Sequence, residues 1–287
     1  MNNKIYLMTA IIAFASVGAL LIQPTLASAQ PKNSNNPLDI LGTSSSSGRS
    51  SATSLLGSTE DIPSASLSCG QVITTSVKLS ANLDCASDGL LVQGDNIVID
   101  LNGHTIKGPG PSASKIGISV AANDGVQITG SGTITGFQAG VLASGGKDDT
   151  ITNVNFEGNQ IAIFLTGTTG ADIENNMITN NQIGMAAHSA TSTNFKENVL
   201  TENDLAGVTL VNSGKNKIDT NIIKKSKNGI FNDAQSVDNS ITTNTVMENS
   251  GVDLNNGNGL PINVNGATFT ENLCQTSVPD GLCTAGQ

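Results

Sequence analysis

Three polar side chains and two aromatic rings in the second half of this 287-residue chain could take part in ligand binding or catalysis. They are Phe164, His188, Phe231, Asp233 and Asp253. Imidazole and carboxylate groups exchange protons within hydrogen-bond reach, and Phe rings can stack on sugar faces. Two repeat units separate His188 from Asp233, which places them roughly 10 Å apart in stacked strands. The set therefore predicts a glycan-binding surface, and the sequence identifies no catalytic residue.

Two other groups of charged residues carry weaker signals. Asp148 and Asp149 are adjacent carboxylates, but in a strand they would point to opposite faces, and the preceding glycines favour a turn. A polysaccharide lyase or epimerase would need a base, and the candidates are Lys224, Lys225 and Lys227. A carboxylate beside one of these lysines in a groove would favour the enzyme hypothesis.

Copper would need imidazole or sulfur ligands that converge on one point. The available ligands are His104, His188, Met177, Met185 and Met247. Met185 is predicted to point inward, and about four repeat units separate His104 from His188. The sequence therefore predicts no metal site and no cofactor.

These residues lie in a pattern of about 22 residues that runs from Ile116 to Asn272. A Gly or Ala opens each unit, at Gly117, Gly140, Ala162, Gly184, Gly207, Gly229 and Gly251. A second apolar position follows, at Ile128, Ile151, Ile173, Phe195, Ile218, Ile241 and Ile262. An Asn or Ser closes the units, at Asn159, Asn181, Asn203, Ser226, Asn249 and Asn272. A fixed period of this length indicates stacked units that share one core.

The residues inside each unit favour strands. Apolar and polar residues alternate, β-branched residues and Asn dominate, and helix-forming runs are absent. A leucine-rich repeat has a similar period but requires Leu at sites where this chain has mostly Ile. We therefore predict an all-β, single-stranded, right-handed parallel β-helix of about eight or nine coils, in which Glu174, Lys196 and Asp219 form an outward ladder of alternating charge.

The ends of the chain differ from the repeats. A basic start, an apolar run and an Ala27-Ser28-Ala29 site predict a signal peptide over residues 1–29, with a retained membrane anchor as the alternative. Residues 30–65 are rich in Ser, Asn and Gly and predict a disordered linker, and residues 66–287 predict the β-helix domain. The four cysteines form two close pairs that predict disulfides in the two caps, Cys69 with Cys85 and Cys274 with Cys283.

The formal net charge of −10 and the single Arg argue against nucleic acid as a partner. After removal of the signal peptide, no membrane insertion is expected.

The opening of the domain resembles a known group of proteins. Its motifs are Cys69-Gly-x-Val-Ile-Thr, Gly-Leu-Leu-Val at 89–92 and Asp100-Leu-Asn-Gly-His-Thr-Ile-x-Gly108. They resemble secreted right-handed parallel β-helix repeat proteins, which include the periplasmic copper-maturation family NosD and lie within the pectate-lyase-like superfamily. The resemblance implies the fold, whereas the function varies across such folds.

The resemblance also implies where activity would lie, on the outward face of the first strand row. The first outward row is predicted to be Ser119, Leu142, Phe164, Ala186, Thr209, Phe231 and Asp253. The next is Ala121, Ser144, Thr166, His188, Val211, Asp233 and Asn255. Lyases of this superfamily use a Lys or Arg base and hydrolases a cluster of Asp, and neither row contains such a set.

Three functions remain open from the sequence. The first is a secreted, periplasmic or cell-surface protein without catalytic activity, which presents a ladder face to a glycan or an envelope component. The second is a polysaccharide lyase or epimerase. The third is a periplasmic accessory protein similar to the NosD family.

Overall fold

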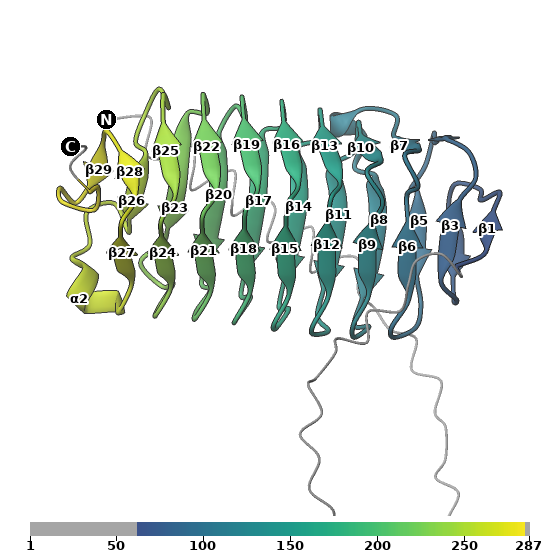
Figure 1. Ribbon diagram of the computed structural model, residues 1–287, viewed down its shortest axis with the longest axis horizontal. Helices are drawn as coiled ribbons and strands as arrows, with labels where there is room; N and C mark the ends of the chain where they lie inside the picture. Colours follow the sequence, from purple (N-terminus) through teal and green to yellow (C-terminus); the bar gives the residue numbers. More distant parts are fainter. Residues whose placement is uncertain (1–61, 285–287) are drawn as a thin grey trace, which may run out of the picture.

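The computed structural model describes residues 62–284, which form three parallel sheets that run side by side along one axis (Figure 1). The chain visits the sheets in turn, so each coil adds one strand to each sheet. The sheets have ten, ten and nine strands, which corresponds to about nine coils. The predicted all-β parallel β-helix of eight or nine coils is confirmed. The predicted signal peptide and most of the predicted linker lie outside the described residues.

Sheet A contains β1 (Ser64–Ala65), β3 (Val77–Leu79), β6 (Val98–Asp100), β9 (Gln127–Thr129), β12 (Thr150–Thr152), β15 (Asp172–Glu174), β18 (Asn194–Lys196), β21 (Lys217–Asp219), β24 (Ser240–Thr242) and β27 (Thr268–Thr270). Sheet B contains β2 (Gln71–Ile73), β5 (Leu90–Val92), β8 (Ile116–Ala121), β11 (Ala139–Ser144), β14 (Ile161–Thr166), β17 (Ile183–His188), β20 (Ala206–Val211), β23 (Asn228–Asn232), β26 (Leu254–Asn256) and β29 (Ser277–Val278). Sheet C contains β4 (Leu83–Asp84), β7 (Thr105–Lys107), β10 (Thr133–Thr135), β13 (Asn155–Glu157), β16 (Met177–Thr179), β19 (Val199–Thr201), β22 (Ile222–Lys224), β25 (Thr245–Met247) and β28 (Leu273–Cys274). The helical segments of the described residues are short, at Pro111–Ala113 and in α2 (Ile262–Asn265).

The register stacks equivalent apolar residues of successive coils in the interior. In sheet A, Ile151 pairs with Ile173, which pairs with Phe195. All three side chains are buried, as the repeat predicted. The opening Gly of each unit lies where coils approach closely, because a Cβ on Gly184 would lie 2.6 Å from the carbonyl oxygen of Gly207.

Buried Asn side chains satisfy the backbone at the two corners where the chain leaves sheet A and sheet C. At the corner between sheets A and C, the backbone N–H of Asn176 donates to Oδ1 of Asn198 at 3.0 Å, and that of Asn198 donates to Oδ1 of Asn221 at 3.0 Å. At the other corner, the N–H of Asn159 donates to Oδ1 of Asn181 at 2.9 Å. The buried turn amides are thus paired from coil to coil without water.

The last coil departs from the predicted pattern. Asn272 is wrongly placed by the repeat, because its Oδ1 accepts from the N–H of Asn244 and it belongs to the corner between sheets A and C. Ile262 lies in α2 with 43% of its surface exposed, and Phe269 takes the predicted place beside Ile241. The extra residues around α2 shift the sequence relative to the coils, and a fixed period cannot follow such an insertion.

The two ends are closed by disulfides with the predicted pairing. Cys69 bonds to Cys85 and Cys274 bonds to Cys283. The first strand, β1, begins just ahead of the predicted domain start at residue 66. Among the described residues, no helix combines the length and apolar character that a membrane crossing requires.

Candidate functional site

The two predicted aromatic ligands lie on the outer side of sheet B. Phe164 pairs with Leu142 and Ala186, and Phe231 pairs with Thr209, so their predicted row is confirmed. Their predicted exposure is wrong, because only 8% and 7% of the two residues are exposed. Rings that are buried to this extent cannot offer a face to a sugar in this structure.

His188 and Asp233 lie at the edge of the same sheet and do not contact each other. His188 pairs with Val211, and the N–H of Asp233 donates to the carbonyl oxygen of Leu210, so two coils separate the side chains as predicted. Oδ1 of Asp233 accepts a hydrogen bond from the N–H of Asn212 at 3.1 Å. This carboxylate supports a turn, and the pair forms no acid–base couple.

Asp253 does not lie in the outward row, and its predicted position is wrong. Asn255 pairs with Phe231 in its place. The Asp253 carboxylate is buried and accepts hydrogen bonds from Asn249 Nδ2 at 2.8 Å, from the N–H of Gln275 at 2.9 Å and from the N–H of Thr276 at 3.0 Å. Asp253 therefore holds the C-terminal cap.

The other charged residues also act within the fold. Asp148 has a left-handed backbone with φ of 58°, which confirms the predicted turn. The candidate bases Lys225 and Lys224 lie 3.6 Å and 4.0 Å from the carboxylates of Glu202 and Glu248, and these pairs are largely exposed. Exposed pairs of this kind contribute little energy.

The predicted charge ladder is confirmed in register, since Glu174 pairs with Lys196 and Lys196 with Asp219. The nearest ion pair of Lys196 is with Glu197 at 3.1 Å, and this contact raises the pKa of Lys196. Burial would raise the pKa of Asp219, but hydrogen bonds from Thr242 and Lys217 outweigh it and lower that pKa.

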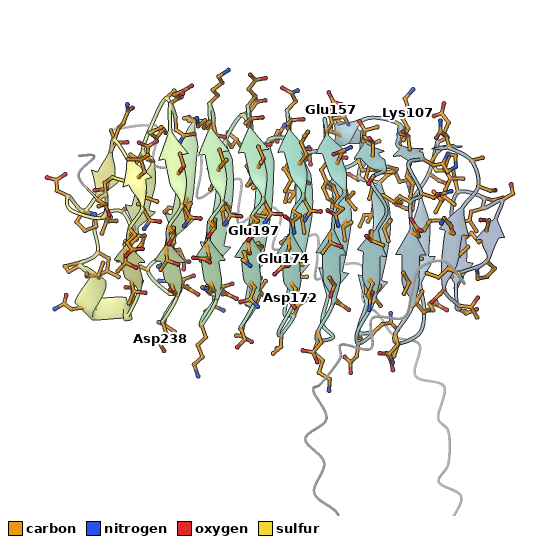
Figure 2. All side chains as sticks on the ribbon, in the orientation of Figure 1. Lys107, Glu157, Asp172, Glu174, Glu197 and Asp238 are labelled. Carbon is orange, nitrogen blue, oxygen red and sulfur yellow. A yellow bond between two sulfur atoms is a disulfide. The ribbon has the colours of Figure 1, made fainter. Side chains whose placement is uncertain are left out.

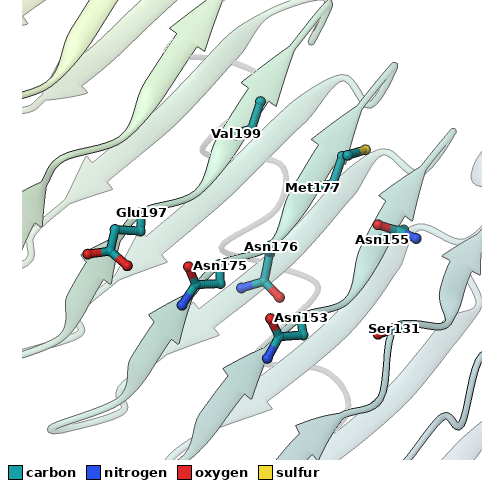
Figure 3. Close-up of a pocket in the computed structure, with 8 residues that line it drawn as sticks. All are labelled: Ser131, Asn153, Asn155, Asn175, Asn176, Met177, Glu197 and Val199. Atoms are coloured by element: carbon teal, nitrogen blue, oxygen red, sulfur yellow. The ribbon is translucent and has the colours of Figure 1, made fainter.

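A groove at the corner between sheets A and C is the candidate site that the sequence did not reveal (Figure 3). It has a volume of about 390 Å³ and crosses four coils. Its lining residues are Ser131, Asn153, Asn155, Asn175, Asn176, Met177, Glu197 and Val199. Their spacing of about 22 residues was visible in the sequence, but nothing there distinguished exposed corner amides from buried ladder amides.

The corner geometry explains why the groove is rich in Asn. Asn153, Asn175 and Glu197 occupy the left-handed region with φ of 57°, 57° and 55°, which Asn tolerates better than most residues. In this backbone conformation, each of these side chains points away from the buried Asn ladder. Asn176, in contrast, forms the floor, where its Nδ2 donates to the carbonyl oxygen of Ile151 at 2.9 Å.

The groove combines polar and apolar contacts. The side chains of Asn153 and Asn175 are exposed and that of Asn155 is half-buried, whereas Asn176 makes the hydrogen bonds of the ladder. Met177 is 53% exposed and Val199 is 36% exposed beside them. Figure 2 shows Glu174 and Glu197 on the same side of the solenoid. Such a surface can donate to and accept from hydroxyl groups while it packs on apolar carbon.

The copper ligand candidates do not converge. Within the described part of the chain, no three His, Cys, Asp or Glu side chains form a possible metal site. His104 precedes β7 whereas His188 ends β17, and Met185 is fully buried in the core. Met177 and Met247 lie in β16 and β25 of sheet C, with two strands between them. The described residues therefore do not fit a bound copper ion.

Comparison with known proteins gives two findings and one negative result. No curated protein matches the chain significantly. The crystal structure of Dettilon tailspike protein (gp208) matches with a TM-score of 0.54 at 16% identity, over 74% of this chain and 54% of the tailspike chain. The chain thus spans about half the length of that tailspike chain, and the likeness shows the fold alone.

A family model also matches the sequence. The family is described as "Periplasmic copper-binding protein (NosD)", and the match covers residues 74–281. This range is well over half of the chain and includes the coils that line the groove. The protein therefore belongs to the NosD family.

Proposed function

We propose that this protein is a non-catalytic β-helix protein that binds an extended glycan or another polymeric envelope component along the groove between sheets A and C. The NosD family and the two disulfides are those of an extracytoplasmic protein. Its place would be the periplasm, the cell surface or the secreted fraction. The sequence-based prediction of glycan binding is kept, but its site moves from the outer face of sheet B to this groove.

The observation that carries the proposal is the pair of exposed amides in neighbouring coils of the groove, Asn153 and Asn175. Asn153 and Asn175 occupy equivalent corners, and Asn155 pairs with Met177 in sheet C. Neighbouring coils lie about 4.8 Å apart, and Ser131 and Glu197 flank the two amides, so polar side chains recur at a regular interval along the groove. A polymer of similar repeating units could contact several coils in the same manner.

The charge of the groove favours a neutral glycan over a polyuronate. Glu197 is the charged residue among those that line it. The ammonium group of Lys196, which precedes Glu197 in the chain, lies 3.1 Å from the Glu197 carboxylate. The carboxylates of an acidic polymer would therefore be repelled by Glu197, and no lysine or arginine among the residues that line the groove would offset this repulsion. This argues against the lyase and epimerase alternative, whose substrates carry carboxylates.

A glycan array probed with the exported protein tests the proposal. Asn155→Ala removes one amide from the groove and Met177→Ala removes one apolar contact. We expect each to weaken binding about fivefold, because one hydrogen bond or small apolar contact is worth about 1 kcal/mol. The matched control is Asn263→Ala, which removes an exposed Asn in α2, away from the groove.

Two results would contradict the proposal. If no glycan binds, or if Asn263→Ala weakens binding as much as Asn155→Ala, the groove is not the site. Incubation with uronate polymers, followed by ultraviolet detection of unsaturated products, addresses the enzyme alternative. Product formation would show that the protein is a lyase.

A further inference from the structure

Sheet B differs from the other two sheets because its strands carry buried apolar residues on both faces, whereas the outward apolar residues Met177, Val199 and Ile222 of sheet C are exposed. Its inward residues belong to the main core, whereas its outward residues form a separate buried cluster. We refer to two columns of outward residues as the outer apolar face: Ile116, Ala139, Ile161, Ile183 and Ala206, and beside them Leu142, Phe164, Ala186, Thr209 and Phe231. Each of these residues is at most 8% exposed.

The outward positions of sheet A are polar in the same coils. One column there reads Thr150, Asp172, Asn194, Lys217 and Ser240. Parallel strands with apolar residues on both faces are typical of sheets that have a second layer packed on them. The composition of sheet B thus indicates a covered face.

The described hydrophobic residues provide no second layer over this outward cluster. Besides the residues of sheet B, the partly buried hydrophobic side chain that packs against the cluster among the described residues is Leu205, in the turn before β20. At the edge of the face, Oε1 of Gln160 is buried and lacks a hydrogen-bond donor. A segment that crosses this face would cover the apolar columns and bring backbone N–H groups to that acceptor.

We propose that the outer apolar face is the docking site of residues 37–41 of the same chain. This segment reads Pro37-Leu38-Asp39-Ile40-Leu41 and is an apolar stretch in an otherwise polar region. In an extended chain, Leu38 and Ile40 point to the same side while Asp39 points away, toward water. At about 3.3 Å per residue, the five residues span about 16 Å, which covers three to four strand spacings.

The length of the preceding chain permits this contact. Twenty residues lie between Leu41 and Ile62, the first described residue, and they reach at most about 70 Å when extended. The first strand, β1, lies in sheet A six strands before β18, a distance of about 29 Å along the axis. The linker can therefore pass round the solenoid to the middle of sheet B. Because the segment is tethered, its effective concentration at the face is high.

Disulfide trapping in the exported full-length protein tests the contact. Ile40→Cys is combined with Ala186→Cys on the outer apolar face. The matched control combines Ile40→Cys with Val199→Cys, an exposed position on sheet C. We expect an intramolecular disulfide to form at least about tenfold faster with Ala186→Cys, because docking raises the local concentration of the pair. Peptide mapping identifies the bond, and N-terminal sequencing confirms that residue 40 is present.

The outcomes separate the possible occupants. Faster trapping within one chain, which is lost when Leu38→Asp is added, supports the proposal. Equal rates at Ala186→Cys and Val199→Cys would overturn it. A bond between two chains would also overturn it, because a second copy would then occupy the face. The control pair carries the same substitution at residue 40 and therefore reports the trapping rate at a position where no docking is expected, and circular dichroism of both double variants checks that they fold.

Discussion

Asp149 should make the stability of the protein depend on pH, and Asp149→Asn should remove that dependence. The residue is 4% exposed and lies in the turn directly before β12. Its Oδ1 accepts from the N–H of Val126 at 2.9 Å, while its buried Oδ2 has no hydrogen-bond partner. Burial raises the pKa to about 6 from 3.8, and the nearby carboxylates of Asp124 and Asp148 add to the rise, whereas the Val126 hydrogen bond opposes it.

The sign follows from proton binding. The folded state binds the proton more tightly than the unfolded state, so the contribution is fully present below pH 3.8 and is lost as the pH rises through about 6. A shift of about two pKa units corresponds to about 3 kcal/mol. Asn cannot titrate, and the structure shows how it would fit. Asn216 occupies the equivalent place three coils on, where its Oδ1 accepts from the N–H of Thr193 and its Nδ2 donates to the carbonyl oxygen of Ala190.

The assay is urea unfolding followed by circular dichroism at about pH 3.5 and pH 7.5. We expect the free energy of unfolding of Asp149→Asn, relative to the natural protein, to rise by about 3 kcal/mol between these two pH values. Asp238→Asn is the control, because it removes an exposed carboxylate that also has a left-handed backbone, with φ of 56°. A difference between the natural protein and Asp149→Asn that stays constant with pH would refute the reasoning.

Two further predictions concern the ladders and the caps. Asn198→Ala should lower the free energy of unfolding by about 3 kcal/mol, because the buried N–H of Asn176 loses its acceptor, Nδ2 of Asn176 loses one of its two acceptors, and the carbonyl of Ile173 loses the Nδ2 donor of Asn198. Urea unfolding measures this loss, and a loss below about 1 kcal/mol would contradict the prediction. Cys69→Ala with Cys85→Ala opens a disulfide of sequence separation 16 and should cost about 3 kcal/mol. The same loss should follow reduction of that bond, and unchanged unfolding would show that the N-terminal cap does not need it.

The sequence was sufficient for the fold because the fold is periodic. Each coil repeats the same contacts, so the positions of Ile151, Ile173 and Phe195 define the register of sheet A without further information. Both disulfide pairs followed from their positions at the two ends of that repeat. The prediction failed where the period failed. Phe231 is followed by Asn255 in the next coil rather than by Asp253, because the turn between β25 and β26 is longer than the turn between β22 and β23.

The site was harder to predict because a repeat does not state which surfaces are covered. The run Ile161-Ala-Ile-Phe-Leu165 fits a strand in which inward and outward residues alternate, and this pattern predicts that the outward Phe164 contacts a ligand. Its continuous apolar character was in fact the signal of a strand that is buried on both faces. The corner residues were missed for a different reason. Whether an Asn lies inside or outside depends on its φ, as the neighbours Asn175 and Asn176 show.

These neighbours also explain how the groove and the ladder support each other. Asn176 can turn inward and bond to Asn198 only because Asn175 adopts the left-handed conformation just before it. The same step points the Asn175 side chain outward, into the groove (Figure 3). At the corner between sheets A and C, each Asn of the ladder follows a left-handed residue with a side chain, at Asn175, Glu197, Thr220, Thr243 and Glu271. A fold that needs a regular Asn ladder for stability thus presents a regular row of side chains along its outer corner, and in this chain two of them are amides that can bind hydroxyl groups.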